Sequence, residues 1–185
     1  MKILGVTTDP SKLIQGYSLE FQRMMGILSK KYKVTVLTNA YGRSYGVIKD
    51  SPNFSDNPNL TYALTELKKQ NYFLKGLEFI LANRFFKGEW DLVISNNELP
   101  DLVLSWFLCS RDRIPKMAVI HDDYLRGGSM RIKAVYWLKT QIIKKYDILL
   151  FVNNHTLRSM KKKHNLKSEL IFIGNAVCDN NGQRI

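Results

Sequence analysis

The chain has 185 residues, of which 45% are hydrophobic and 24% are charged, a balance typical of one globular domain with a substantial core. No stretch approaches the roughly 20 consecutive apolar residues that cross a bilayer, so a membrane-spanning helix is not expected. The two cysteines, Cys109 and Cys178, lack metal-ligand and CxxC spacing, which favours a reducing, cytoplasmic compartment.

The charge is strongly positive, with 28 Lys and Arg residues against 16 Asp and Glu residues, for a formal net charge of +12. Such an excess attracts acidic partners, which include nucleic acid, anionic lipid and phosphorylated small molecules. The alternative interpretation is a basic protein whose lysines only solvate its surface. The sign of the charge does not choose between these partners.

Short apolar runs predict seven strands, and the first is taken as a strand rather than a signal peptide because no small-residue cleavage site follows it. The runs are Lys2–Thr7, Lys33–Thr38, Leu60–Leu64, Asp91–Ser95, Lys116–His121, Asp147–Val152 and Glu169–Ile173. Helices are predicted between them. These helices are Tyr17–Lys31, Asn71–Phe86, Pro100–Cys109, Ser129–Tyr146 and Asn154–His164.

The alternation of strands and helices predicts the fold class. Strands that are apolar throughout are covered on both faces, so we expect one α/β domain with a single Rossmann-like, doubly wound parallel sheet and helices on both faces. Ala40–Asn59 is rich in Gly, Ser, Pro, Asn and Asp and predicts a long loop. Apolar stripes at helical spacing mark two of the helices. They are Leu74, Leu77, Leu81 and Phe85 in one helix, and Val135, Leu138 and Ile142 in the other.

Ligands of such sheets bind at the carboxyl ends of the strands, so the residues that follow each strand are the candidate site. The first loop leads into a helix through Gln15 and Gly16. A helix N-terminus favours an anion, and Gly16 lets a phosphate approach the backbone closely. A glycine that only permits a tight turn is the alternative. No GxGxxG or GxxxxGK[ST] motif is present, so a dinucleotide or Walker-type site is not supported.

A polar cluster, His121, Asp122 and Asp123, directly follows the fifth predicted strand. His121 is the candidate catalytic residue, because an imidazole hydrogen-bonds a sugar hydroxyl or moves a proton near neutral pH. The adjacent carboxylates point in different directions, so they make a poor acid/base pair. A structural role, in which an aspartate caps the next segment, is the alternative for Asp122 and Asp123.

Three asparagines follow other strands of the predicted sheet and are candidate substrate-binding residues. They are Asn96, Asn153 and Asn175, the last in a Gly-Asn turn. The alternative is a plain exit from strand to loop.

The stretches at and after the strands resemble the N-terminal domain of glycosyltransferase family 4. The matching stretches, in the family's order, are Met1–Leu4, Gly16, Tyr32–Thr38, Asp91–Asn96, Pro115–Asp122, Tyr146–Asn153 and Leu170–Cys178. The family usually has a second glycine where this chain has Gln15. The resemblance implies one Rossmann-like half of a GT-B fold over residues 1–178. Residues 179–185 would then be a polar tail where the interdomain linker begins.

The resemblance also implies a function: the acceptor-side half of a glycosyltransferase that uses a nucleotide sugar, with retention of configuration. A donor-binding C-terminal domain or subunit, which carries paired glutamates in the family, would complete the enzyme. No cofactor and no obligatory metal are implied, and the nucleotide sugar is a co-substrate. Gly16 would approach the donor phosphate, His121 would lie near the reacting sugar, and the loop after it near the acceptor.

Positive charge gathers in and next to the last two predicted helices, and Tyr136 and Trp137 are interleaved with it. The basic residues are Arg126, Arg131, Lys133, Lys139, Lys144, Lys145, Arg158, Lys161, Lys162, Lys163 and Lys167. This surface predicts contact with an anionic membrane or a lipid-linked acceptor, and a solvated face is the alternative.

Two other functions remain open at this stage. One is a non-catalytic Rossmann-like module that binds an anionic ligand or partner. The other is a basic nucleic-acid-binding protein, although no recognition helix, zinc finger or RNP motif is present and no specific nucleic acid is expected.

Overall fold

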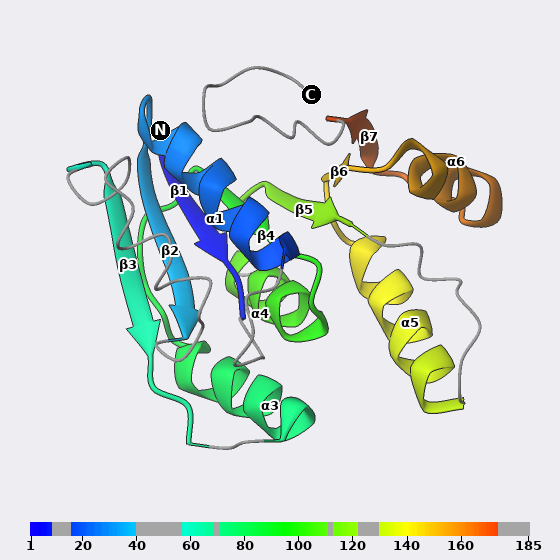
Figure 1. Cartoon of the computed structure of the whole chain (residues 1–185), viewed down its shortest axis with the longest axis horizontal. Coiled ribbons are helices and arrows are strands. Elements are labelled where there is room, and N and C mark those ends of the chain that lie inside the picture. Colours follow the sequence, from blue (N-terminus) through cyan, green and yellow to red (C-terminus); the bar gives the residue numbers. More distant parts are fainter. Residues whose placement is uncertain (9–15, 40–56, 69–70, 111–112, 122–129, 174–185) are drawn as a thin grey trace.

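A computed structural model of the chain describes residues 1–8, 16–39, 57–68, 71–110, 113–121 and 130–173. Within these ranges one parallel sheet has the strand order β3-β2-β1-β4-β5-β6-β7 (Figure 1). The strands are β1 (Lys2–Val6), β2 (Lys33–Asn39), β3 (Leu60–Thr65), β4 (Leu92–Ser95), β5 (Lys116–Ile120), β6 (Ile148–Phe151) and β7 (Glu169–Phe172). The predicted parallel sheet is confirmed.

The helices of the described ranges alternate with these strands. They are α1 (Gly16–Ser29), α3 (Tyr72–Asn83), α4 (Leu99–Ser110), α5 (Met130–Ile143) and α6 (Asn154–Lys163). Asn71 caps α3, because its side-chain oxygen accepts from the backbone N–H groups of Phe73 and Leu74, at 3.0 and 3.4 Å. No described helix is both long and apolar enough to cross a membrane.

Helix α1 covers one face of the sheet. Its Phe21 and Met25 are buried against the strands, over Gly5 of β1. A Cβ atom at Gly5 would lie 2.6 Å from Met25 Sδ, so a larger residue here would displace the Met25 side chain. The core on this face consists of Ile3, Phe21, Met25, Val34, Val36, Ile94, Val119 and Leu150.

The other helices pack on the opposite face, where the strand residues alternate with those under α1. Phe79 of α3 and Leu104 of α4 join one buried cluster with Leu4, Val6 and Leu37. A second cluster gathers residues of β5, β6, α4, α5 and α6. It consists of Leu102, Ala118, Ile120, Ile143, Tyr146, Leu149, Phe151 and Met160. Helices on both faces of one parallel sheet are the predicted Rossmann-like, doubly wound architecture.

The two apolar stripes noted in the sequence predict helices correctly, but they do not lie on the buried faces. In α3 the residues that face the core are Gly76, Phe79 and Asn83, and the leucine stripe points outwards. In α5 the buried residues are Lys139, Thr140 and Ile143. Val135 and Leu138 are exposed, and of the stripe only Ile142 packs partly against the core. Helical periodicity therefore predicts the helix correctly here, but it does not predict which face of the helix is buried.

Candidate functional site

The order of the strands places a topological switch point at the centre of the sheet. From β1 the chain builds outwards through β2 and β3, and it then returns to β4 on the other side of β1. Ligands of doubly wound sheets bind in the crevice outside the carboxyl ends of the strands at this point. Val6 pairs with Ser95, so Thr7 and Asn96 leave β1 and β4 side by side.

His121 lies at this same edge, directly after β5, and its side chain is only 8% exposed. Its Nδ1 atom is 3.7 Å from Oε2 of Glu20, which lies in the second turn of α1 and is half-exposed. The first turns of α1 and the end of β5 therefore meet beside the switch point. A carboxylate next to an imidazole orients the ring, so the pair is placed to hydrogen-bond a hydroxyl at this edge.

Asp101, in the first turn of α4, is a fully buried carboxyl group that sequence reasoning missed. Both the backbone N–H and the hydroxyl of Thr8 donate to its Oδ1 atom, at 2.6 and 2.5 Å. Asp101 thereby ties the loop after β1 to the start of α4. The sequence feature that could have pointed to Asp101 is an acidic residue in the first turn of a helix that closely follows a strand.

Burial raises the pKa of the Asp101 carboxyl well above its ordinary value of 3.8, and nearby Glu98 adds to the rise while the Thr8 hydrogen bonds oppose it. The folded chain therefore binds a proton that the unfolded chain has already released. The contribution of Asp101 to stability is fully present below pH 3.8, and it is lost as the pH rises through the raised pKa.

Two substitutions at Asp101 test this account. Asp101→Ala is expected to lower the free energy of unfolding by about 1–3 kcal/mol, because it leaves the buried Thr8 N–H without its acceptor. Asp101→Asn keeps an acceptor for Thr8 and removes the titration, so its stability is expected to decline less between about pH 4 and pH 8. Urea unfolding across that range measures both. An Asp101→Asn protein with the pH dependence of the wild type would contradict the raised pKa.

Asn96, a predicted substrate-binding residue, lies fully buried behind the edge. Its side-chain Nδ2 donates to Thr7 Oγ1 at 3.1 Å, and its backbone N–H donates to Val6 O at 2.9 Å. Asn96 therefore joins the carboxyl ends of β1 and β4 to each other. In this position it supports the shape of the crevice.

Lys139 is not part of a solvated basic face, contrary to the alternative reading of the charged helices. It is buried, and its Nζ atom lies 3.7 Å from Oε2 of Glu98, in a pair whose side chains are 8% and 13% exposed. The pair connects α5 to the segment between β4 and α4, close to Asp101. A lysine that is buried against a carboxylate holds the two elements together and does not contribute an exposed cation.

The other predicted site residues fall into two groups. Gly16 is the first residue of α1, and Asn153 is the N-cap of α6, where its side-chain oxygen accepts from His155 N at 2.8 Å. The remaining predictions lie outside the described residues. They are Gln15, Asp122, Asp123 and Asn175. The structure therefore places Glu20, four residues after Gly16, beside His121, and it gives Asn153 a capping contact two strands beyond β4.

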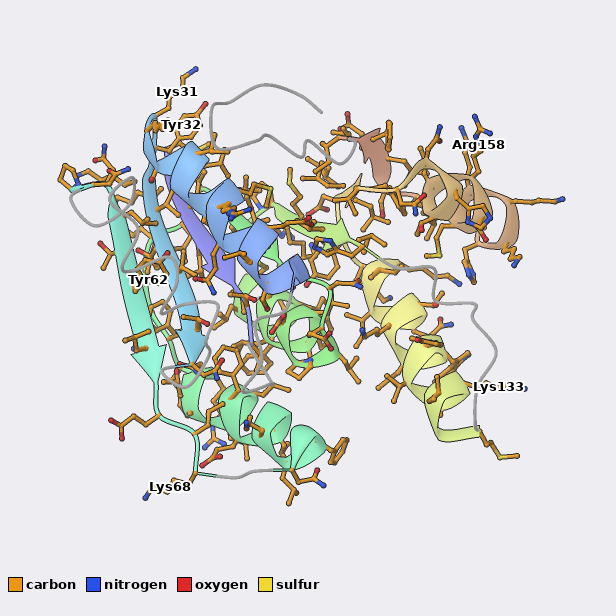
Figure 2. The ribbon with its side chains drawn as sticks, in the orientation of Figure 1. Lys31, Tyr32, Tyr62, Lys68, Lys133 and Arg158 are labelled. Atoms are coloured by element: carbon orange, nitrogen blue, oxygen red, sulfur yellow. The ribbon has the colours of Figure 1, made fainter. Side chains whose placement is uncertain are left out.

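Positive charge is spread around the described part of the chain. Figure 2 shows Lys133 and Arg158 on α5 and α6 at one side of the molecule, and Lys31 and Lys68 near the opposite side. Trp137 of α5 is well exposed, whereas Tyr136 is partly buried against the core. The excess of cations is therefore not confined to α5 and α6.

Comparison with known proteins gives fold relatives and no sequence relatives. No protein-family model matches the chain, and no curated protein matches it in sequence. Sucrose-phosphate synthase from Thermosynechococcus elongatus superposes with a TM-score of 0.67 at 11% identity, over 94% of this chain and 47% of that one. UDP-GlcNAc 2-epimerase from Methanocaldococcus jannaschii gives 0.66 at 10% identity, over 95% and 46%.

A plant enzyme is a third structure with this fold. Phytolacca americana UGT2, in complex with UDP-2fluoro-glucose and pterostilbene, superposes with a TM-score of 0.66 at 7% identity, over 94% of this chain and 53% of that one. The chain thus spans about half the length of these solved structures, whose architecture is GT-B. The match confirms the Rossmann-like half of a GT-B fold, and it does not single out family 4.

Proposed function

We propose that this chain is the acceptor-side half of a glycosyltransferase that moves a sugar from a nucleotide-sugar donor to an acceptor with retention of configuration. The observation that carries the proposal is the pairing of His121 with Glu20 at the carboxyl edge of a GT-B half-domain. This edge is where doubly wound sheets bind ligands, and His121 directly follows β5 there.

Each predicted site residue has a role in this proposal. His121 hydrogen-bonds the reacting sugar, and Glu20 orients its ring. Gln15 and Gly16 place the start of α1 against the donor phosphate, because a helix N-terminus favours an anion. Asp122 and Asp123 line the acceptor side. No cofactor and no obligatory metal take part.

The fold relatives support the class of donor. Sucrose-phosphate synthase and UGT2 share this half-domain, and UGT2 is solved with UDP-2fluoro-glucose. Because this chain spans about half of each, we infer that the nucleotide is held by a second domain or subunit. A cytoplasmic setting is part of the same proposal, because neither cysteine of the sequence has metal-ligand or CxxC spacing.

An extract assay tests the proposal. Cells that lack this chain are lysed, and transfer of radiolabelled sugar from a panel of nucleotide sugars to endogenous acceptors is measured with and without the purified chain. The proposal expects added chain to restore at least one transfer product. Unchanged products with every donor, from an extract in which the chain stays folded, would overturn it.

Calorimetry of the purified chain with nucleoside diphosphates and nucleotide sugars tests which half of the proposed enzyme binds the nucleotide. The acceptor-side assignment expects no tight nucleotide binding by this half. Micromolar binding that Gly16→Val or His121→Ala removes would instead show a complete nucleotide site in this chain, and the acceptor-side assignment would be wrong.

A further inference from the structure

Helix α3 carries an apolar ridge on the face opposite the core. Phe73, Leu77, Leu81 and Phe85 recur every fourth residue, so they form one row along the helix and its C-terminal extension. They are exposed by 69%, 45%, 49% and 60%, and Leu74 beside them by 46%. The ridge is not needed to fix α3 to the sheet, because Phe79 and the close contact of Gly76 with Pro100 already do so. A contiguous row of this kind marks an interaction surface.

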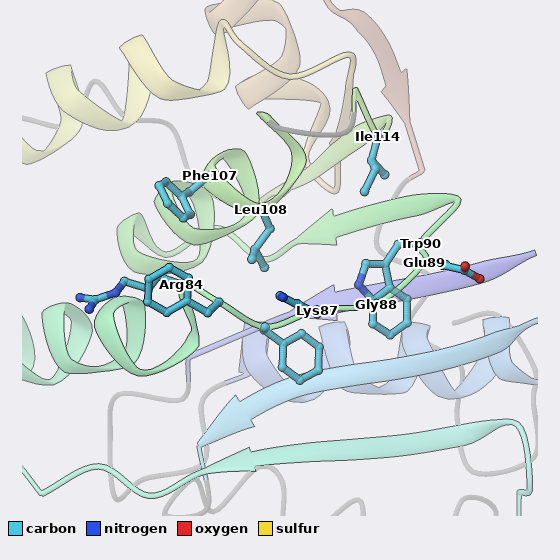
Figure 3. Close-up of a pocket in the computed structure, with 10 residues that line it drawn as sticks. Arg84, Lys87, Gly88, Glu89, Trp90, Phe107, Leu108 and Ile114 are labelled. Atoms are coloured by element: carbon cyan, nitrogen blue, oxygen red, sulfur yellow. The ribbon is translucent and has the colours of Figure 1, made fainter.

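Cations and aromatic rings border the C-terminal end of this α3 ridge. The Arg84 guanidinium lies over the Phe85 ring, 4.8 Å from its centre, and Lys87 follows it. An open cavity of about 550 Å³ adjoins them between the α3–β4 connection and the end of α4 (Figure 3). Its apolar and aromatic lining residues are Phe85, Phe86, Trp90, Phe107, Leu108 and Ile114.

The shape and the charge of this surface together indicate its occupant. The α3 ridge projects from a single outer helix, so a partner that covers it must be able to deform around it. The ridge itself carries no charge, and the acidic Glu78 on its flank accepts hydrogen bonds from the backbone N–H of Lys68. Arg84 and Lys87 at its end, on a chain of net charge +12, complement a negatively charged surface. An interfacial helix with apolar side chains inserted and Arg and Lys at the headgroups has these properties.

We propose that the α3 ridge docks the chain on an anionic lipid bilayer, with the side chains of the ridge among the acyl chains and Arg84 and Lys87 against the lipid phosphates. The aromatic ring of Phe85 then lies at headgroup depth, where aromatic side chains are favoured. This surface differs from the basic α5–α6 face that the sequence indicated. The inference holds whether or not the chain transfers sugar.

Vesicle binding by the full chain tests the docking surface. The chain is mixed with phosphatidylcholine vesicles and with phosphatidylcholine–phosphatidylglycerol vesicles, and the bound fraction is measured by flotation. Binding is expected to the anionic vesicles and to fall with salt. The double variant Leu77→Glu/Leu81→Glu is expected to bind at least about tenfold more weakly, since each leucine loses its transfer from water. Arg84→Gln and Lys87→Gln are each expected to weaken binding about fivefold.

Matched variants distinguish a specific loss of the α3 ridge from a general effect of added negative charge. Ile27 is 63% exposed on α1, on the other face of the sheet, so Ile27→Glu is expected to leave vesicle binding unchanged. Circular dichroism verifies that each variant is folded. Retained binding in the double variant, or equal loss in Ile27→Glu, would overturn the proposal. So would a wild-type dimer that ignores vesicles and becomes monomeric in the double variant, because the ridge would then be a contact between copies.

Discussion

His121→Ala is expected to lower the transfer restored in the extract assay by about 10²–10⁴-fold, the range typical of a positioned acid, base or hydrogen-bonding group. The side chain is almost buried at the carboxyl edge, beside Glu20. His121→Gln keeps a hydrogen-bond donor of similar reach and is expected to retain more activity than His121→Ala. Initial rates at saturating and limiting donor concentrations measure the effect.

His164→Ala is the matched control for this experiment. His164 is the C-cap of α6, at the opposite end of that helix from the carboxyl edge, so its loss is expected to leave transfer within about twofold of the wild type. Circular dichroism compares the folded fraction of both variants. If His121→Ala transfers sugar as well as His164→Ala does, His121 has no part in the chemistry.

Phe21→Ala is expected to lower the free energy of unfolding by about 3–5 kcal/mol, a large part of the stability of a domain of this size. Phe21 is 1% exposed and fills the space over Gly5, where α1 packs on β1. Its removal leaves a cavity that the strands cannot close. Because Phe21 adjoins Glu20, the same change is expected to weaken the contact of α1 with His121. Urea denaturation gives the stability.

Ile27→Ala on the same helix is the control for this loss, because Ile27 is 63% exposed. It is expected to change the stability by no more than about 0.5 kcal/mol. Equal losses in Phe21→Ala and Ile27→Ala would mean that helix propensity, and not the packing of α1 on β1, determines the effect.

The strands and helices of this chain could be predicted closely from sequence, because buried parallel strands are continuous apolar runs. The predicted strand Lys33–Thr38 becomes β2, one residue longer, and the predicted helix Asn71–Phe86 becomes the shorter α3. His121 could be predicted to lie at the carboxyl edge for the same reason. It directly follows an apolar run, and parallel strands bring all their carboxyl ends to one edge.

The partners of the buried polar residues could not be predicted, because they come from distant parts of the chain. Asp101 bonds to Thr8 across 93 positions, and Lys139 pairs with Glu98 of another segment. Charged residues are usually exposed, so their types alone indicated a solvated face. The outward direction of the α3 ridge could not be predicted either. Helical spacing identifies an apolar face, but in α3 that face lies on the surface, and Gly76, Phe79 and Asn83 face the core.

The central position of β1 has a consequence for synthesis of the chain. Ile3 pairs with Val34 of β2, 31 positions later, but Lys2 bonds to Asp91, just before β4, across 89 positions. Ribosomes add about 5–20 residues each second, so the segment that pairs with the second edge of β1, which is β4, is synthesised about 4–18 s after β1. Throughout that interval the nascent chain presents the apolar edge of its first strand to other proteins. Chaperone binding during this interval would therefore have more effect on the yield of folded protein than binding after release.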